Sequence, residues 1–325
     1  MLDVWWPPGH HDHPLTGESR DVHPITCNPS SSSSTRPRAL LRSASVLLLG
    51  GLLACAGSSV ASEDPPTEPA VGQTWVQAVP GTAVELVMKP VPGAGETLWV
   101  MENELTWNLF DIFIFRLDEK KGQSNSASDA VTRPTKPYIA VDRGFGHDGY
   151  PAISMSFKGA LQFAEWVSAK TGRTFRIPTV EQWSRICTAA KIPSEDLAEY
   201  AWYEVNSGET THPVGSRKAD QLGLHDLYGN VGEWCHAGGT AEKPVGVLMG
   251  GGYESPATQL DCVHTVPYDP MWNDSDPQFP KSIWWLADAA YVGLRLVCVE
   301  PDDPTPTKAS QNTQPAPPED VHDES

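Results

Sequence analysis

The sequence contains no apolar run close to the roughly 20 residues that a membrane-spanning helix needs. Basic residues are also scarce, with 23 Lys and Arg against 41 Asp and Glu, and the formal net charge is −18. Such a charge repels the phosphate backbones of nucleic acids, which argues against nucleic-acid binding. The 27 glycines and 30 prolines, in contrast, are abundant. Because both residues interrupt helices, they argue against a helix bundle or a coiled coil and favour turns and irregular loops.

Several motifs of metal binding and catalysis are also absent. No two cysteines are spaced as C-x-x-C, the arrangement typical of structural zinc sites. No G-x-S-x-G elbow is present, which argues against a hydrolase with a serine nucleophile. The histidines of the central region show no metal-ligand spacing, and we expect each at the surface or in a hydrogen bond. They are His147, His212, His225, His236 and His264.

The amino-terminal region has the features of an export signal. Basic residues from Arg36 onward precede an apolar stretch at 46–54, and Cys55 follows it. The end of this stretch reads Leu-Leu-Ala-Cys and resembles a bacterial lipobox, in which the cysteine becomes the lipidated first residue; the alternative is a buried helix with an incidental cysteine. Because such a signal normally stands at the start of a protein, we expect translation to begin near residues 40–41 and residues 1–39 to be an extension of the gene model.

Composition divides the chain into four predicted parts. Residues 1–54 are the extension and the lipoprotein signal peptide, residues 55–72 a flexible tether, residues 73–300 a single domain, and residues 301–325 a disordered, acidic and proline-rich tail. We expect an exported protein that a lipid on Cys55 anchors to the bacterial cell envelope. Ala56 lacks the aspartate associated with retention in the inner membrane, which favours the outer membrane.

Apolar spacing and caps indicate helices within residues 73–300. Residues 157–167 carry apolar side chains at i, i+3 and i+4, with Ser156 as the N-cap. Thr179 and Gln182 form a capping box at the start of a second helix. A third helix is expected over residues 108–117. Short apolar runs separated by glycines fill the remainder, so we predict an irregular α+β domain with few helices and short sheets.

The same region holds four cysteines. An even number of cysteines is typical of disulfides in an exported domain. Four cysteines allow three pairings, and their positions alone do not choose among these. The four are Cys187, Cys235, Cys262 and Cys298.

Several separated stretches form an ordered set of motifs. They are Glu104-Leu105-Thr106, Pro-Ala-Ile-Ser-Met-Ser-Phe at 151–157, Arg-Ile-Pro-Thr-Val-Glu-Gln-Trp at 176–183, His-Pro-Val-Gly at 212–215, Gly-Leu-His-Asp-Leu-Tyr-Gly-Asn-Val-Gly-Glu-Trp at 223–234, Gly-Gly-Gly-Tyr at 250–253 and Gly-Leu-Arg at 293–295. In this order, the set resembles the formylglycine-generating enzyme (sulfatase-modifying factor) family, and the stretch at 223–234 is its most specific element. The resemblance extends over about residues 84–299 and implies an irregular fold similar to that of C-type lectins.

The resemblance implies a structural Ca²⁺ ion at the stretch 223–234. Its ligands would be the side chain of Asp226, the carbonyl oxygens of Gly229 and Val231, and the carboxylate of Glu233. These are hard oxygen ligands of the kind that Ca²⁺ prefers. The alternative is that Asp226 and Glu233 cap turns by hydrogen bonding.

The match does not extend to the catalytic residues. Active members of the family oxidise a substrate cysteine to formylglycine with a copper ion that is held by two cysteines shortly after a Gly-Gly-Ser turn. Ser255 and Leu260 stand at the positions of these two cysteines, and Gly252 replaces the serine of the turn. Copper(I) needs soft thiolate ligands. We therefore predict no copper site, since Cys262 is a single thiol that lies two residues out of register.

The resemblance assigns Cys262 a structural role instead. Cys187 falls where family members carry a half-cystine whose partner lies beyond the Gly-Gly turn. The expected disulfides are therefore Cys187–Cys262 and, between the remaining pair, Cys235–Cys298.

The sequence thus indicates a lipid-anchored member of the family that has lost its catalysis. We expect a binding or scaffold module for an extracytoplasmic protein, peptide or glycan. The predicted contact surface is Tyr253, Glu254, Trp284 and Trp285, because aromatic side chains give a large contact area at low entropic cost; the alternative for the tryptophans is core packing. A second hypothesis is an oxidoreductase of the same family that uses a different metal or substrate. A third is a structural envelope lipoprotein without a specific ligand.

Overall fold

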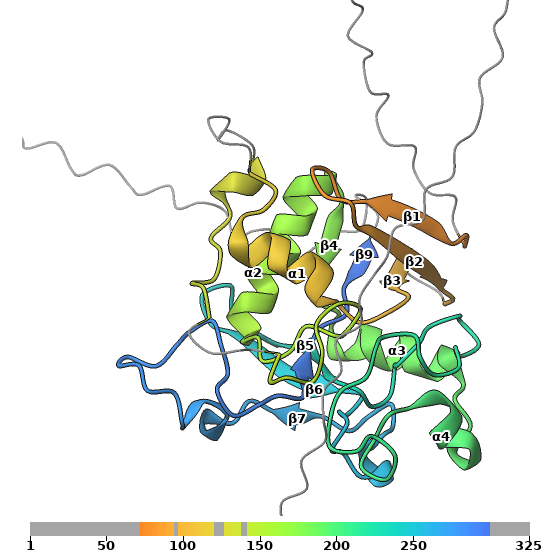
Figure 1. Ribbon diagram of the computed structural model, residues 1–325. Coiled ribbons are helices and arrows are strands. Elements are labelled where there is room, and N and C mark those ends of the chain that lie inside the picture. Colours follow the sequence, from red (N-terminus) through yellow and green to blue (C-terminus); the bar gives the residue numbers. More distant parts are fainter. Residues whose placement is uncertain (1–71, 94–96, 120–126, 138–141, 300–325) are drawn as a thin grey trace, which may run out of the picture. The chain divides into compact units, whose positions relative to one another are not determined.

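The computed structural model describes residues 72–93, 97–119, 127–137 and 142–299, which all belong to one compact unit of the chain (Figure 1). The predicted signal peptide, the lipidation site Cys55, nearly all of the tether and the acidic tail lie outside the described residues. Among the described helices, none combines the length and the apolar character that crossing a membrane requires.

One sheet has five strands in the order β1-β2-β3-β9-β4, and all its neighbours are antiparallel. The strands are β1 (Trp75–Ala78), β2 (Glu85–Val91), β3 (Leu98–Met101), β9 (Val297–Val299) and β4 (Thr174–Arg176). The last described strand, β9, therefore lies between β3 and β4, two strands from much earlier in the chain.

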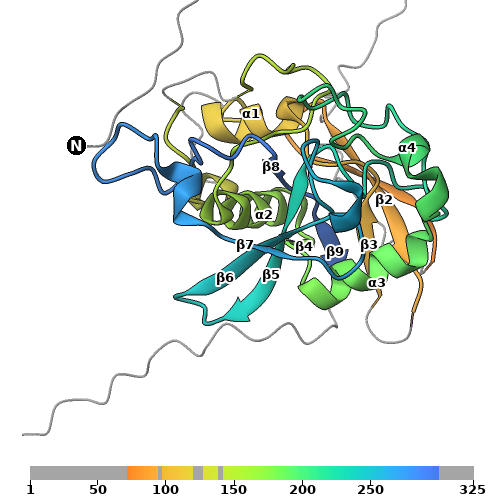
Figure 2. The ribbon, with the colours of Figure 1, turned by 90° about the horizontal axis from the view of Figure 1, so that it is seen from below.

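The second sheet has four strands in the order β7-β6-β5-β8. They are β7 (Val266–Pro267), β6 (Pro244–Met249), β5 (Gly232–Gly239) and β8 (Val292–Gly293). Strands β5 and β6 form an antiparallel hairpin, and β8 pairs with the start of β5 in parallel. Figure 2 shows this hairpin extending beyond the short strands β7 and β8.

The described helices are short. The α-helices are α1 (Trp107–Phe115), α2 (Phe157–Thr171), α3 (Val180–Ala190) and α4 (Leu197–Tyr200), and the 3₁₀ turns are η1 (Ala127–Ala130), η2 (Ser194–Asp196), η3 (Ala257–Gln259) and η4 (Pro270–Asn273). All three helices expected from the sequence are present. This content of few helices and short sheets confirms the predicted irregular α+β fold.

Local capping sets the ends of α2 and α3 as predicted. The Ser156 hydroxyl accepts a hydrogen bond from the amide of Gly159 at the start of α2, and Gly172 ends the helix in the left-handed conformation with φ 70°. At α3, the Thr179 side chain accepts from the Gln182 amide while the Gln182 side chain accepts from the Thr179 amide. Both bonds of the capping box are therefore made.

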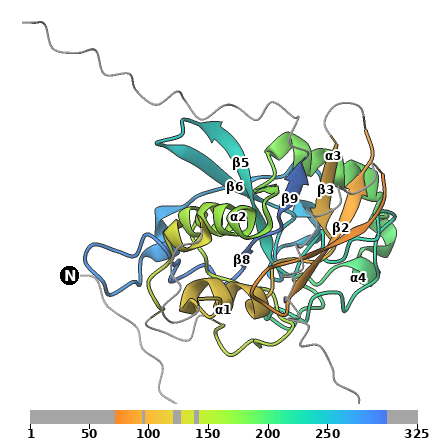
Figure 3. The ribbon, with the colours of Figure 1, turned by 90° about the horizontal axis from the view of Figure 1, so that it is seen from above.

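The five-stranded sheet is buried on both faces by two apolar clusters. Side chains alternate along β3, so that Trp99 and Met101 join a cluster with α1 and α2, whereas Leu98 and Val100 join a cluster with α3. Figures 2 and 3 show α1 and α2 on one side of β3 and β9, and α3 on the other. We call these the α1–α2 cluster and the α3 cluster.

The disulfide Cys187–Cys262 is present, as predicted, with the two Cα atoms 5.5 Å apart. It ties the end of α3 to the loop that follows the glycine turn at 250–252. The Tyr228 hydroxyl lies 2.9 Å from Sγ of Cys187 and 3.3 Å from Sγ of Cys262. Burial raises the pKa of Tyr228 to about 12, so this phenol stays protonated beside the disulfide.

The predicted disulfide Cys235–Cys298 is wrong. The two residues belong to different sheets, since Cys235 lies in β5 and Cys298 in β9. Cys235 faces the α3 cluster, whereas Cys298 faces the α1–α2 cluster, so their side chains point into separate parts of the core. Both remain as buried thiols, and burial raises the pKa of Cys235 well above its usual value.

The disulfide makes the first testable prediction. The variant Cys187→Ala/Cys262→Ala should lose about 2–4 kcal/mol of unfolding free energy, because a cross-link between residues 75 positions apart restricts the unfolded chain. Urea unfolding with and without reductant measures this loss. Reductant should destabilise the wild type and leave the double variant unchanged. A reductant effect that persisted in the double variant would contradict the assigned pairing.

Candidate functional site

Four charged side chains that are distant in the sequence meet in the interior of the domain. Glu104 follows β3, Asp226 lies in the loop before β5, Glu233 is the second residue of β5, and Arg295 lies between β8 and β9. None is more than 1% exposed. Burial of three carboxyl groups with a single guanidinium is costly unless each group finds partners. We call this set the carboxylate–arginine cluster.

Arg295 uses all five of its N–H donors. Its Nε donates to Oε1 of Glu233 at 2.6 Å. One terminal nitrogen donates to the carbonyls of Met101 and Glu102, at 3.0 and 2.8 Å, and the other to the carbonyls of His225 and Asp226, at 2.7 and 3.2 Å. The guanidinium therefore joins the end of β3, the loop before β5 and the start of β5.

Glu233 connects this cluster to α3. Its second oxygen accepts a hydrogen bond of 2.7 Å from the indole nitrogen of Trp183, which has no exposed surface. Burial raises the pKa of Glu233 above its usual value, and Arg295 opposes this shift by favouring the ionised form. Both oxygens of Glu233 therefore already have donors from the protein.

Glu104 holds the turn at residues 229–231. Its two oxygens accept from the Val231 amide at 3.0 Å and from the side-chain amide of Asn230 at 2.6 Å. This turn needs glycine at Gly229, where φ is 76° and a Cβ would overlap the carbonyl of Trp202. Burial and the nearby Asp226 raise the pKa of Glu104 well above its usual value.

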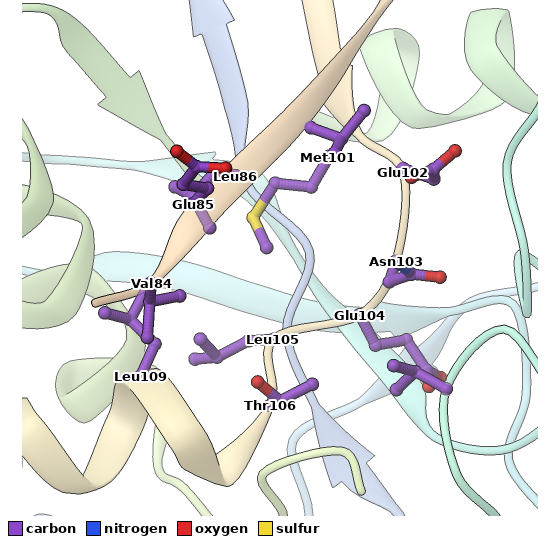
Figure 4. Close-up of a pocket in the computed structure, with 12 residues that line it drawn as sticks. Val84, Glu85, Leu86, Met101, Glu102, Asn103, Glu104, Leu105, Thr106 and Leu109 are labelled. Carbon is purple, nitrogen blue, oxygen red and sulfur yellow. The ribbon is translucent and has the colours of Figure 1, made fainter. Parts of the chain in front are cut away.

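Glu104 is a structural residue whose role the sequence did not reveal. Its stretch was recognised as a family motif, but nothing in the sequence connects it to Asn230, which lies 126 residues away. Figure 4 shows its surroundings, with a small pocket of about 100 Å³ that Glu104 lines. The Glu104 side chain points away from Val84 and Leu109 on the opposite side of this pocket.

Asp226 carries an oxygen that lacks a partner. Its Oδ2 accepts from the amide of Gly215 at 2.7 Å, whereas its buried Oδ1 has no hydrogen bond within the described structure. An acceptor of this kind is costly in the interior. Burial also raises the pKa of Asp226.

This geometry fits a Ca²⁺ ion through only part of the predicted ligand set. Oδ1 of Asp226 is an available hard ligand, and three carboxyl groups outnumber the one guanidinium. Glu233, in contrast, is bound to Trp183 and Arg295, although a carboxylate oxygen has a second lone pair. In the described part of the chain, no three His, Cys, Asp or Glu side chains are grouped as metal ligands. Asp226 and the turn carbonyls would therefore carry most of the coordination.

The structure places Ser255 and Leu260 against the same glycine. A Cβ added at Gly251 would contact the side chains of both residues. The Ser255 hydroxyl accepts a hydrogen bond from the Gly252 amide at 2.9 Å, and Leu260 is buried in the α3 cluster. The two positions that resemble the cysteine pair of the family are thus neighbours in space, with a hydroxyl and an isobutyl group in place of thiols.

The predicted contact surface needs correction, because its aromatic residues are packed inside the domain. Tyr253, Trp284 and Trp285 are 6, 8 and 4% exposed, and only Glu254 lies at the surface. Trp285 packs edge-on against Phe110, and its indole nitrogen donates to a backbone carbonyl at 2.9 Å. Core packing, the alternative considered for the tryptophans, is therefore the correct interpretation.

The exposed apolar surface lies next to Trp284 instead. A groove of about 870 Å³ runs between the start of α2, the outer part of β6 and the loop at 282–286. Three of its apolar side chains are about half exposed: Val245, Tyr268 and Ile283. Nothing in the sequence distinguishes these residues from core residues, because their exposure depends on tertiary packing.

The carboxylate–arginine cluster gives the second prediction. Arg295→Met should lower the unfolding free energy by about 3–5 kcal/mol, since it leaves three buried carboxyl groups without their cation. Lys218→Met is the matched control. It removes a cation from an exposed pair with Glu199 and should leave the unfolding free energy nearly unchanged. Urea unfolding measures both variants, and equal losses would contradict the central role of Arg295.

Comparison with known proteins places these features in a family. The chain is 28% identical to the chaperone protein LppX of Paenibacillus barcinonensis over 168 residues, which cover 43% of this chain and 58% of LppX. It is 30% identical to the serine/threonine-protein kinase pkn1 of Chlamydia caviae over 140 residues, which cover 37% of this chain and 22% of the kinase. The chain therefore spans less than two thirds of the length of either relative.

Among solved structures, variable protein 1 of Treponema denticola has a TM-score of 0.48 and 18% sequence identity, with 71% of this chain and 99% of that chain covered. The family model of the sulfatase-modifying factor enzyme 1-like domain matches residues 95–276, which is more than half of the chain. This match contains the most specific motif, at 223–234, and the turn with Ser255 and Leu260. The chain belongs to the sulfatase-modifying factor enzyme 1-like domain family.

Proposed function

We propose that this domain is a non-catalytic binding or scaffold module for an extracytoplasmic protein, peptide or glycan. The observation that carries the proposal is the pair Ser255 and Leu260, which lie together at Gly251 and offer no sulfur ligand. Copper(I) chemistry needs at least two soft ligands at this place.

The proposed location is the cell envelope, with the lipid on Cys55 as the anchor. The basic and apolar stretch before this cysteine supports export. The relative LppX is named as a chaperone protein. A protein-binding role for this chain is consistent with the half-exposed apolar groove beside α2.

The third prediction tests the loss of chemistry on the full-length chain. Purified protein should contain no stoichiometric copper or iron and should consume no oxygen with a cysteine-containing peptide and a thiol reductant. Metal analysis and an oxygen electrode measure this. Stoichiometric copper or iron together with turnover would instead support the second hypothesis, an oxidoreductase that uses another metal or substrate.

Thiol replacement provides the matched control for this test. Ser255→Cys/Leu260→Cys should bind copper(I) at least about a hundredfold more tightly than the wild type, because two soft ligands then flank Gly251. Competition with a copper(I) chelator measures the affinity. The single variant Ser255→Cys should gain much less, and tight copper(I) binding by the wild type would contradict the proposal.

The fourth prediction concerns the proposed structural Ca²⁺. Addition of Ca²⁺ should raise the melting temperature of the full-length protein, and Asp226→Ala should remove this increase, because Oδ1 of Asp226 is a buried acceptor without a donor. The control is Asp288→Ala, since both oxygens of this exposed carboxylate already accept hydrogen bonds from the amide and the hydroxyl of Ser275. This variant should keep the Ca²⁺ response. A wild type that shows no response would indicate that Asp226 only caps its loop.

A further inference from the structure

The half-exposed groove lies at the outer end of the β5–β6 hairpin, away from the carboxylate–arginine cluster at the start of β5. Its apolar lining comes from α2, from β6 and from the loop at 282–286. The principal residues are Phe157, Leu161, Val245, Tyr268, Ile283 and Leu286. Its volume of about 870 Å³ is enough for several side chains. We call it the hairpin groove.

One edge of β6 is open at this groove. Strand β7 pairs with β6 only at Val247 and Leu248, through Pro267 and Val266. Pro267 has no N–H group with which to extend the ladder. Within the described residues, Pro244 and Gly246 therefore pair with β5 alone, and Val245 lies between them where the register of the ladder shifts. Figure 2 shows this part of the hairpin extending past β7. An open strand edge is a template for another strand.

The open edge is held in place by packing on α2. Gly246 lies so close to the Phe157 ring that any Cβ would clash with it. Phe157 in turn packs on Trp234 of β5, with the ring centroids 5.2 Å apart. The hairpin is thus fixed against the start of α2, and a strand added to its edge would lie beside a preformed apolar surface. Every second side chain of that strand would face the surface.

The lining of the hairpin groove carries two lysines against one glutamate, whereas the whole chain has a net charge of −18. Lys158 and Lys243 are exposed at the rim, and Glu242 is the one acidic residue of the lining. Nζ of Lys158 lies 4.7 Å from the centre of the Trp284 ring. No described carboxylate lies within ion-pair distance of either lysine. The groove therefore favours a partner that carries negative charge.

We propose that the hairpin groove binds an extended, acidic and apolar peptide segment of a partner protein, which adds as a strand to the open edge of β6. Backbone hydrogen bonds to the edge at 244–246, where Pro244 offers only its carbonyl oxygen, provide the attachment. Apolar side chains enter the groove, and carboxylates reach Lys158 and Lys243. This inference rests on the proposed binding function and names the class of its partner.

The experiment uses full-length protein and fluorescein-labelled octapeptides in which Val and Asp alternate. Fluorescence anisotropy should show saturable binding of this peptide. Replacement of Asp by Lys should weaken binding about tenfold, since the rim then repels the peptide. Two further peptides carry N-methyl groups on all Val amides or on all Asp amides. At least one of them should bind about tenfold more weakly than the parent peptide, because strand addition needs peptide N–H donors. If both methylated series bind as tightly as the parent peptide, strand addition is wrong.

Charge reversal provides a test that does not depend on lost folding. The variant Lys158→Glu/Lys243→Glu should bind the Val-Asp peptide about tenfold more weakly than the wild type does. It should bind the Val-Lys peptide, in which Lys replaces Asp, about tenfold more tightly. Ile283→Asp should also weaken binding of the Val-Asp peptide, since this variant places a negative charge in the groove. Lys218→Glu, remote from the groove lining, should leave both peptides unchanged. If the double variant shows no change in preference, the groove is not the binding site.

Capture from envelope and secreted fractions separates this inference from the proposed function. A partner captured equally by the wild type and by Lys158→Glu/Lys243→Glu would overturn the hairpin groove as the site and leave the binding function standing. If the wild type captures neither a protein nor a glycan from these fractions and binds neither peptide, the binding function itself is wrong. Loss of a captured partner in the double variant, together with the switch in peptide preference, supports both.

Discussion

The guanidinium of Arg295 is the interaction on which the arrangement of the two sheets depends. It lies between β8 and β9, and its five donors reach the end of the first sheet, the loop before β5 and Glu233 at the start of the hairpin. A buried cation is favourable only when each donor has an acceptor, and here four of the acceptors are backbone carbonyls. Arg295 donates hydrogen bonds to backbone carbonyl oxygens of the irregular loops, and this allows the loops to be buried.

The sequence predicted those features that depend on interactions between residues close together in the chain. Ser156 and the pair Thr179 and Gln182 define helix starts because capping bonds join residues three apart in the chain. The pairing of Cys235 with Cys298 failed because it depended on which face of a strand each residue occupies, and that in turn depends on how two sheets are assembled. Burial of Trp284 and Trp285, like the role of Glu104, also follows from contacts between distant segments.

The motif at 223–234 illustrates why a recognised pattern does not define a role for each residue. Asp226 and Glu233 are seven positions apart and both are buried carboxylates, so the pattern suggests equivalent ligands. In the structure, Glu233 bridges Trp183 and Arg295, whereas Asp226 keeps one oxygen without a donor. Glu233 therefore stabilises the junction of α3 with β5, whereas Asp226 has an oxygen to which no donor of the described structure is bonded.

The β5–β6 hairpin explains how binding and catalysis can be separated in this fold. Its start lies in the carboxylate–arginine cluster, and β6 ends just before the glycine turn that brings Ser255 and Leu260 together. Its outer end depends instead on the contact of Gly246 with Phe157 and on the stop that Pro267 imposes on β7. Because different contacts support the two ends, a change of residues at the turn would leave the open strand edge intact. The proposed loss of the family's chemistry would therefore place no physical constraint on the proposed binding role at the far end of the hairpin.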